Sequence, residues 1–276
     1  MTILITGGTG KTGGKLAQLL QAAQQPVLIA SRSGVAPGPF KAVEFDWTDE
    51  KTFENPFKAD PNIDKVYLVA TVPFELVKPF IDLAVAKGVK RIVFCSATAM
   101  EKGMYSYGKI HEYIVDVGVD YVVLRPSWFI ENFGTAYAPS ILQTDTIWTV
   151  AGDGRVPYVS VDDIAKAAFD ALVAKEGANT DYYVLGPKLY NHDEIAALLS
   201  EVIGRKITHE RVTSEESIAR FTALGIDKDY ATMLTTFLAK LADGEEELLF
   251  TSPKAIIGKV GLRDYFEANK NIWVKK

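Results

Sequence analysis

The sequence predicts an α/β protein with a doubly wound parallel sheet and a smaller, mainly helical C-terminal part. In its first half, short β-branched runs alternate with amphipathic stretches. Several runs, such as Val66–Val69 and Ile92–Cys95, are apolar at nearly every position, which indicates strands covered on both faces. A glycine-rich loop follows the first run directly. Repetition of strand, helix and strand builds a parallel sheet with helices on both sides, the Rossmann-type arrangement.

The strands and helices of the first half follow from these patterns. Strands are predicted at Thr2–Thr6, Pro26–Ala30, Ala42–Phe45, Lys65–Val69, Arg91–Cys95 and Asp120–Leu124. Helices are predicted between them, at Gly13–Ala23, Pro73–Lys87 and Ser106–Val117. In the first helix, Leu16, Leu19 and Leu20 recur at the spacing of a core-facing stripe.

After residue 125 the segments become more mixed. A loop-rich Pro126–Thr149 and a turn at Gly152–Gly154 precede a helix at Val161–Lys175 and a strand at Tyr182–Leu185. Further helices are predicted at Asn191–Ile203, Ser214–Leu224 and Lys228–Ala242. We expect a nucleotide-type sheet domain over residues 1–150 and a substrate-binding cap over 151–276, with about 155–185 returning to the sheet. Ligands of open α/β sheets bind at the carboxyl ends of the strands, where such a cap would lie.

The composition excludes several classes of protein. With 276 residues, 48% hydrophobic and 24% charged, the chain is neither disordered, collagen-like nor a coiled coil. A net charge of −5 argues against nucleic acid as a partner. The apolar runs are short of the roughly 18 residues of a membrane helix, and no basic, then apolar, leader opens the chain. One cysteine, Cys95, rules out an internal disulfide and fits a reducing compartment, so we expect a cytoplasmic protein. The composition does not decide between a monomer and a homodimer.

The loop after the first strand reads Thr6-Gly7-Gly8-Thr9-Gly10-Lys11-Thr12-Gly13 and opens into a helix. Glycines at such spacing permit a tight turn, a close approach of backbone N–H groups to a pyrophosphate, and close packing of helix on strand. A triphosphate-binding loop is excluded, because Ile5 stands where its first glycine is needed. We therefore expect a dinucleotide to be held by Gly7, Thr9, Gly10, Lys11, Thr12 and Gly13.

The end of the second strand indicates which dinucleotide is bound. It reads Ser31-Arg32-Ser33, with no carboxylate for the ribose diol of NAD, and a guanidinium pairs well with the extra phosphate of NADP. The predicted cofactor is NADP(H), with Ser31 and Arg32 as ligands. By position, Asp46 is expected near the adenine, and Ala70 and Thr71 near the nicotinamide-side ribose.

Tyr105 and Lys109 form a Tyr-x-x-x-Lys pattern after the fifth strand. On a helix these positions share one face, and a nearby ammonium lowers the pKa of a phenol toward the working pH. Tyr105 is the expected proton donor, although it can equally line a pocket wall, and Lys109 is expected to hold the nicotinamide ribose as well. Ser96 and Thr98, just past the fifth strand, are the two candidate hydroxyl partners, and Ser96 is also an expected cofactor ligand.

At this point the residues resemble a known family. Phe45-Asp46-Trp47, Leu124-Arg125-Pro126-Ser127-Trp128-Phe129-Ile130-Glu131-Asn132 and Ala151-Gly152-Asp153-Gly154-Arg155-Val156-Pro157 are similar to NmrA-like atypical short-chain dehydrogenases/reductases. Within them, the chain most resembles the fungal ergot-alkaloid branch of festuclavine and agroclavine dehydrogenases, nearly end to end.

The resemblance implies an NADP-dependent oxidoreductase of secondary metabolism that reduces a small polycyclic or heterocyclic intermediate at an iminium, imine, enone or ketone. It also implies that Pro126, Trp128 and Phe129 border the nicotinamide, although the two aromatic side chains are equally explained as core. Members of the alkaloid branch do not all keep Tyr-x-x-x-Lys. Its presence here favours a substrate that takes up a proton as well as a hydride.

Two other functions remain open at this stage. One is a redox-sensing regulator that binds NADP without catalysis, and the other is a cyclase-like enzyme on the same fold. The three histidines, His111, His192 and His209, lack metal-ligand spacing, so no metal is expected. Aromatic residues of the C-terminal part line a flat apolar pocket or simply form core: Tyr137, Trp148, Phe221, Tyr230 and Phe237.

Overall fold

The computed structural model describes residues 1–275 and divides them into two compact units. The first unit comprises residues 1–126 and 161–184, and the second comprises residues 127–160 and, among the described residues, 185–275. The chain leaves the first unit between Pro126 and Ser127, earlier than the residue 150 expected from the sequence, and returns over Val161–Val184.

The first unit holds seven strands of one sheet, in the order β8-β6-β5-β4-β1-β2-β3. Neighbouring strands of this set pair in parallel. The strands are β1 (Thr2–Thr6), β2 (Val27–Ser31), β3 (Lys41–Glu44), β4 (Ile63–Leu68), β5 (Arg91–Cys95), β6 (Asp120–Pro126) and β8 (Thr180–Leu185). From β1 the chain builds the sheet outward through β2 and β3, then starts again at β4 on the other side of β1. The order of the strands therefore reverses between β1 and β4.

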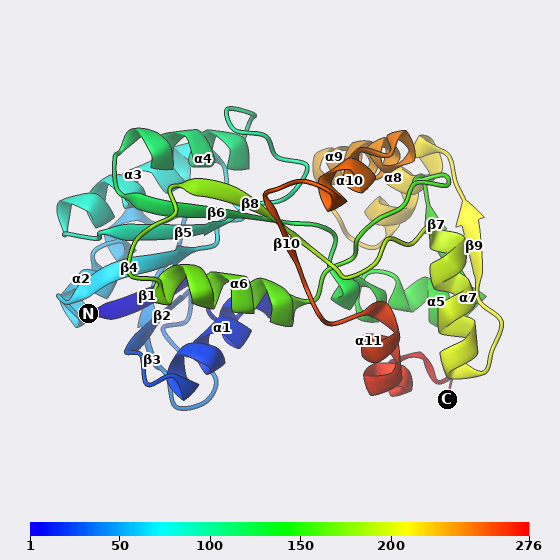
Figure 1. Ribbon diagram of the computed structural model, residues 1–276, viewed down its shortest axis with the longest axis horizontal. Coiled ribbons are helices and arrows are strands. Elements are labelled where there is room, and N and C mark those ends of the chain that lie inside the picture. The colour runs from blue at the N-terminus through cyan, green and yellow to red at the C-terminus, as the bar shows by residue number, and fades with distance from the viewer. Residues whose placement is uncertain (276) are drawn as a thin grey trace. The chain divides into compact units, whose positions relative to one another are not determined.

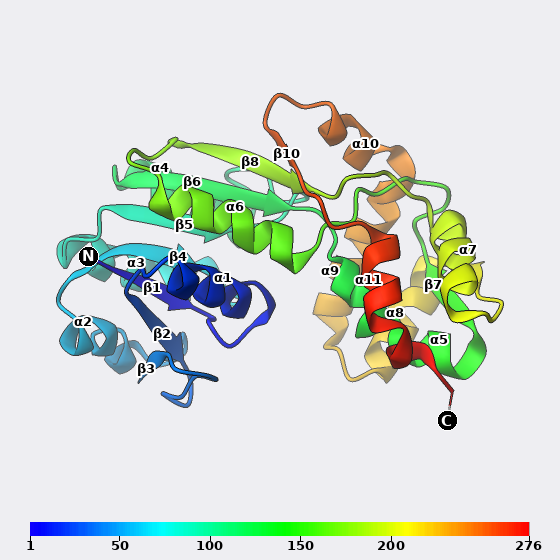
Figure 2. The ribbon, with the colours of Figure 1, turned by 60° about the horizontal axis from the view of Figure 1, so that its bottom comes forward.

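Helices cover both faces of this sheet (Figures 1 and 2). α1 and α6 pack together on one face, and α3 and α4 pack together on the other. The helices of the unit are α1 (Lys11–Ala22), α2 (Asn55–Ala59), α3 (Phe74–Ala86), α4 (Tyr107–Asp116) and α6 (Val161–Val173). The predicted doubly wound parallel α/β sheet is confirmed.

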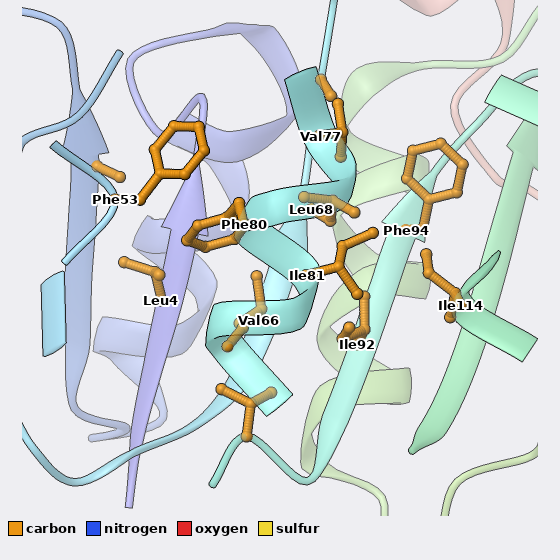
Figure 3. Close-up of a cluster of buried hydrophobic side chains, with 14 of the residues drawn as sticks. Leu4, Phe53, Val66, Leu68, Val77, Phe80, Ile81, Ile92, Phe94 and Ile114 are labelled. Atoms are coloured by element: carbon orange, nitrogen blue, oxygen red, sulfur yellow. The ribbon is translucent and has the colours of Figure 1, made fainter. Parts of the chain in front are cut away.

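The core of the first unit forms because alternate residues of each strand point to opposite faces. Figure 3 shows Val77, Phe80 and Ile81 of α3 lying over strand residues. Those strand residues include Leu4, Val66, Leu68 and Ile92, all almost fully buried. The sheet is thus rigid beneath the loops that leave its carboxyl ends.

The second unit is mainly helical. It contains α5 (Ala138–Thr144), α7 (His192–Ile203), α8 (Ser214–Ala223), α9 (Lys228–Lys240), α10 (Glu245–Phe250), α11 (Leu262–Asn269), and the short strands β7 (Thr146–Thr149), β9 (Thr208–Arg211) and β10 (Ala255–Ile257). The predicted loop-rich stretch at 126–149 was wrong in part, since it contains α5 and β7. β7 pairs with β9, about 60 residues further on, and such distant pairing leaves no local periodicity in the sequence.

Candidate active site

The candidate site lies along the carboxyl edge of the first unit's sheet, around the reversal between β1 and β4. The loop after β1 and the segment after β4 leave neighbouring strands there. Thr6 joins the two, because its Oγ1 accepts the Val69 N–H at 2.8 Å. In open α/β sheets such a reversal opens the crevice in which nucleotides bind.

The glycine loop leaves no room for a side chain at Gly13. Gly7 has a left-handed φ of +67°, and its carbonyl accepts the Gly10 N–H at 2.9 Å. A Cβ on Gly13 would lie 2.5 Å from the Gly7 oxygen and 2.9 Å from the Gly8 Cα. The helix α1 begins at Lys11 without an acidic residue in its first turn. The loop therefore fits an anionic pyrophosphate at a helix N-terminus.

Thr12 lies in that first turn but is turned into the protein. It is buried close to the side chains of Tyr67 on β4 and Cys95 on β5. Burial raises the pKa of the Tyr67 hydroxyl well above its usual value and that of the Cys95 thiol to about 11, so both stay neutral. Only the main chain of Thr12 is then free to face an anion, whereas the side chain of Thr9 is exposed.

Arg32 sits in a turn that the main chain holds rigidly. The Ser31 carbonyl accepts the N–H groups of Gly34 at 3.1 Å and Phe45 at 2.9 Å, and the Ser31 hydroxyl donates to the Val35 carbonyl at 2.8 Å. Ser31 is therefore buried and used by the turn. Arg32 is exposed and makes no ion pair with any other residue of 1–275. A guanidinium held in this way at the end of β2 fits the additional phosphate of NADP.

Asp46 lies near Arg32, directly beyond β3. Its Oδ1 accepts the backbone N–H and the hydroxyl of Thr48, both at 2.8 Å. These bonds, with a smaller contribution from the Arg32 charge, lower the pKa of Asp46 below its usual value. The carboxylate is thus held charged in a fixed orientation, as a contact to an adenine amino group requires.

Three further predicted residues follow β4 and β5. Ala70 is buried and Thr71 is exposed. Ser96 is 5% exposed, and its hydroxyl has no hydrogen-bond partner among residues 1–275. A buried hydroxyl left in this way normally finds a partner, so Ser96 fits a ligand group at this edge.

Tyr105 and Lys109 are not on one helix, contrary to the prediction. α4 begins at Tyr107, and Ser106 before it has a φ of +56° and a ψ of −111°. A non-glycine residue in this region costs on the order of 1–3 kcal/mol and survives only where its surroundings impose it. Tyr105 is 51% exposed in the preceding loop, and Lys109 is exposed in the first turn of α4. The spacing argument for a shared helical face therefore does not apply.

Arg125 is a feature of this edge for which the sequence predicted no role. It lies on β6 and is 1% exposed. Its guanidinium donates to both carboxylate oxygens of Glu101 and, at 2.6 Å, to the Thr98 carbonyl, both in the segment that ends at Tyr105. On the other side it reaches the Asp181 carboxylate at 3.2 Å. The sequence did contain a sign of this role. An arginine inside an otherwise apolar strand that is buried on both faces needs buried polar partners, and these had to come from other segments.

Comparisons with known proteins identify the family. The model of the NmrA-like family matches residues 1–247. The chain belongs to the NmrA-like family. It is 40% identical to the agroclavine dehydrogenase of Claviceps fusiformis and 38% identical to the festuclavine dehydrogenase of Aspergillus fumigatus, with both chains covered completely in each case. The predicted resemblance to this branch is confirmed.

A solved structure agrees in fold with this NmrA-like chain. It is the NADPH complex of the NADPH-dependent quinone oxidoreductase of Escherichia coli, 22% identical, with a TM-score of 0.78. The match covers 96% of this chain and 99% of that one. At this identity the similarity concerns the fold.

Of the three residues that the NmrA-like resemblance implied for the nicotinamide, Pro126 ends β6 and Trp128 and Phe129 lie in the second unit. The Trp128 carbonyl accepts the Val159 N–H at 2.9 Å, and the Val159 carbonyl accepts the Ile130 N–H at 3.0 Å. Trp128 and Phe129 are both half-buried, and Trp128 packs on the core of that unit. They are held firmly but are not fully enclosed.

The other aromatic residues singled out from the sequence are mostly core. Tyr137, Trp148 and Phe221 belong to the buried cluster of the second unit, and Phe237 is buried as well. Tyr230 is exposed.

Two of the three histidines lie against each other, with tilted rings, in the second unit. The rings of His192 and His209 lie 5.2 Å apart, and the Tyr158 hydroxyl lies 2.8 Å from His192 Nε2. Within residues 1–275, no group of three or more potential ligands is arranged to hold a metal. None of the helices in that range is long and apolar enough to cross a membrane.

Proposed function

We propose that this protein is an NADPH-dependent reductase of small cyclic natural-product intermediates. Two features on neighbouring strands carry the proposal: a glycine loop with no room for a side chain at Gly13, and Arg32 on a turn held by main-chain hydrogen bonds. The dehydrogenases of Claviceps and Aspergillus, similar over their whole length, support the reaction class.

The residues expected to hold NADP(H) fall into groups by position. Main-chain N–H groups of the loop face the pyrophosphate, the Arg32 guanidinium pairs with the ribose phosphate, and Asp46 faces the adenine. The residues expected to contact the nicotinamide end are Ala70, Thr71, Ser96, Lys109, Pro126, Trp128 and Phe129.

The bound cofactor supplies a hydride for the electrophilic carbon of the substrate. Tyr105 donates the proton from its Oη to the heteroatom when a carbonyl or conjugated ketone is reduced, because such a reduction leaves negative charge on oxygen. An iminium needs no such proton, since it already carries positive charge. Lys109 holds the nicotinamide ribose in either case.

The substrate class follows from the same relatives. The names of the relatives refer to agroclavine and festuclavine, and we extend to this chain only their general class, a small polycyclic or heterocyclic compound. The single cysteine supports a reducing, cytoplasmic location.

Cofactor choice is tested by titrating the wild type and Arg32→Ala with NADPH and NADH. Loss of a charge-assisted phosphate contact costs about 1.5–3 kcal/mol, or roughly ten- to a hundredfold in affinity for NADPH, and leaves NADH binding unchanged. Arg263→Ala is the matched control, because it removes the same charge from a guanidinium that Glu201 already pairs. Equal wild-type affinities for the two cofactors would refute the assignment.

The reaction is tested by NADPH oxidation with a panel of cyclic iminium ions, imines, enones and ketones. We expect turnover with at least one class. A protein that binds NADPH tightly and turns over none of them would contradict the reductase proposal and favour a redox-sensing regulator.

A further inference from the structure

The loop from Ala97 to Ser106 joins β5 to α4 and carries Tyr105 near its end. It folds back on itself, because the Met100 N–H donates to the Ala97 carbonyl and the Met104 N–H donates to the Glu101 carbonyl, both at 3.1 Å. We call this segment the tyrosine loop.

Arg125 anchors the tyrosine loop at its first half. Its Nη2 donates to the Thr98 carbonyl at 2.6 Å, and Nη1 and Nη2 together hold both oxygens of the Glu101 carboxylate. This two-pronged geometry fixes the orientation of both groups as well as their distance. The Glu101 side chain is 63% exposed, so solvent alone would leave it mobile.

The guanidinium is itself fixed from the opposite side. It reaches the Asp181 carboxylate on β8 at 3.2 Å and lies over the Tyr183 ring, 4.7 Å from its centroid. Arg125 is registered opposite Tyr183 in the sheet. Arg125 therefore bonds to β8 on one side and to the tyrosine loop on the other. In this way it fixes the position of the loop relative to the sheet.

The second half of the loop depends on the first. The Gly103 N–H donates to the Gly108 carbonyl at 2.9 Å, and a Cβ on Gly108 would collide with the Glu101 carbonyl. Between these contacts Ser106 is held at a φ of +56°, next to Tyr105. Such a conformation persists only where the surroundings impose it, and the Glu101 contacts are part of those surroundings.

We propose that Arg125 and Glu101 are positioning residues whose ion pair holds the tyrosine loop in the conformation that presents Tyr105 to the substrate. The inference rests on the proposed function, in which Tyr105 is the proton donor. Misplacement of a catalytic group by about 1 Å costs on the order of a hundredfold in rate, so a modest movement of this loop is sufficient.

The chain offers a matched structural control. Arg91 is likewise a buried arginine on a strand, 3% exposed, and pairs with the half-exposed carboxylate of Asp120 at 3.4 Å. Its other bonds go to carbonyls at and just after the end of α6, those of Ala171, Ala174 and Lys175, and not to the tyrosine loop. Asp120→Asn therefore breaks the same kind of ion pair without touching the tyrosine loop.

The first test needs no cofactor or substrate. Amide hydrogen exchange is measured over residues 97–108 in the cofactor-free wild type, Glu101→Gln and Asp120→Asn. We expect exchange in this segment to be about tenfold faster in Glu101→Gln and unchanged in Asp120→Asn. Equal exchange in all three proteins would overturn the proposal.

The second test asks whether the pair acts through Tyr105. With a carbonyl substrate, Glu101→Gln should lower kcat about tenfold or more and leave the NADPH Kd within about twofold. In a Tyr105→Phe background the same substitution should lower kcat no further, whereas a purely structural defect would multiply the two losses. Arg125→Lys, which keeps the charge but loses the two-pronged bond, should behave like Glu101→Gln.

Failure of the proposed function would appear in the wild type itself, as NADPH binding without turnover of any iminium, imine, enone or ketone substrate. Failure of the positioning role would appear only between variants, as independent effects of Glu101→Gln and Tyr105→Phe. The two outcomes are therefore distinguishable.

Discussion

Replacement of Gly13 by alanine tests whether the loop after β1 can keep its conformation only when residue 13 has no side chain. The new Cβ would lie 2.5 Å from the Gly7 carbonyl oxygen and 2.9 Å from the Gly8 Cα. Both neighbours are backbone atoms, so no flexible side chain can move aside. The neighbouring Gly14 provides the control, because a Cβ there would lie 3.5 Å from the Gly8 oxygen, an ordinary contact.

The magnitude follows from comparing these two substitutions. Alanine is favoured over glycine in a helix by about 0.5–1 kcal/mol, and both positions lie in α1. Overpacking of a rigid site costs about 1–3 kcal/mol, which applies to Gly13 alone. We therefore expect Gly13→Ala to be about 1–3 kcal/mol less stable than Gly14→Ala. The loop must also shift, and the loss of one backbone contact to a phosphate weakens NADPH binding about tenfold or more.

The assay is urea unfolding for stability and calorimetric titration for NADPH affinity, with wild type, Gly13→Ala and Gly14→Ala side by side. Gly14→Ala should unfold no earlier than the wild type and bind NADPH normally. Equal unfolding midpoints and equal affinities for the two alanine variants would refute the account of the loop given above.

Three further predictions concern other parts of the chain. Lys109→Ala should weaken NADPH binding and slow turnover with any substrate. Tyr105→Phe should slow single-turnover NADPH oxidation by ~10²–10⁴-fold, but only with a carbonyl or conjugated ketone. Wild-type rates in both variants would contradict the assigned roles. Burial lowers the pKa of His192 from near 6.5 to about 3, so its neutral form stabilises the fold fully above pH 6.5. This contribution to the free energy of unfolding should fall by up to roughly 1.4 kcal/mol per pH unit between pH 6.5 and pH 3. Urea unfolding at pH 7.5 and pH 5 should therefore show a smaller loss of stability in His192→Gln than in the wild type. Trp273 is 1% exposed and donates from Nε1 to the Phe133 carbonyl at 2.9 Å, so Trp273→Ala should cost about 3–5 kcal/mol in the same assay.

The local sequence was sufficient for the sheet of the first unit and for the glycine loop after β1. β1 and β5 have the predicted bounds, Thr2–Thr6 and Arg91–Cys95, because a buried parallel strand is a short apolar run that its own residues define. The glycine spacing and Arg32 were equally visible, since a tight turn and a phosphate contact need particular residues at adjacent positions.

Tertiary structure decided the rest, where contacts join residues far apart in the chain. Tyr105 lies outside α4 because Ser106 adopts a positive φ that neighbouring contacts impose, and no helical spacing rule contains that information. The role of Arg125 depends on Asp181, 56 residues away, and the pairing of β7 with β9 spans a similar distance. The sequence by itself determined the strands of the first unit, most of its helices and the glycine loop after β1, because those choices depend on neighbouring residues. Which charged side chains meet in the interior, and how the tyrosine loop is held, depended on packing between distant segments.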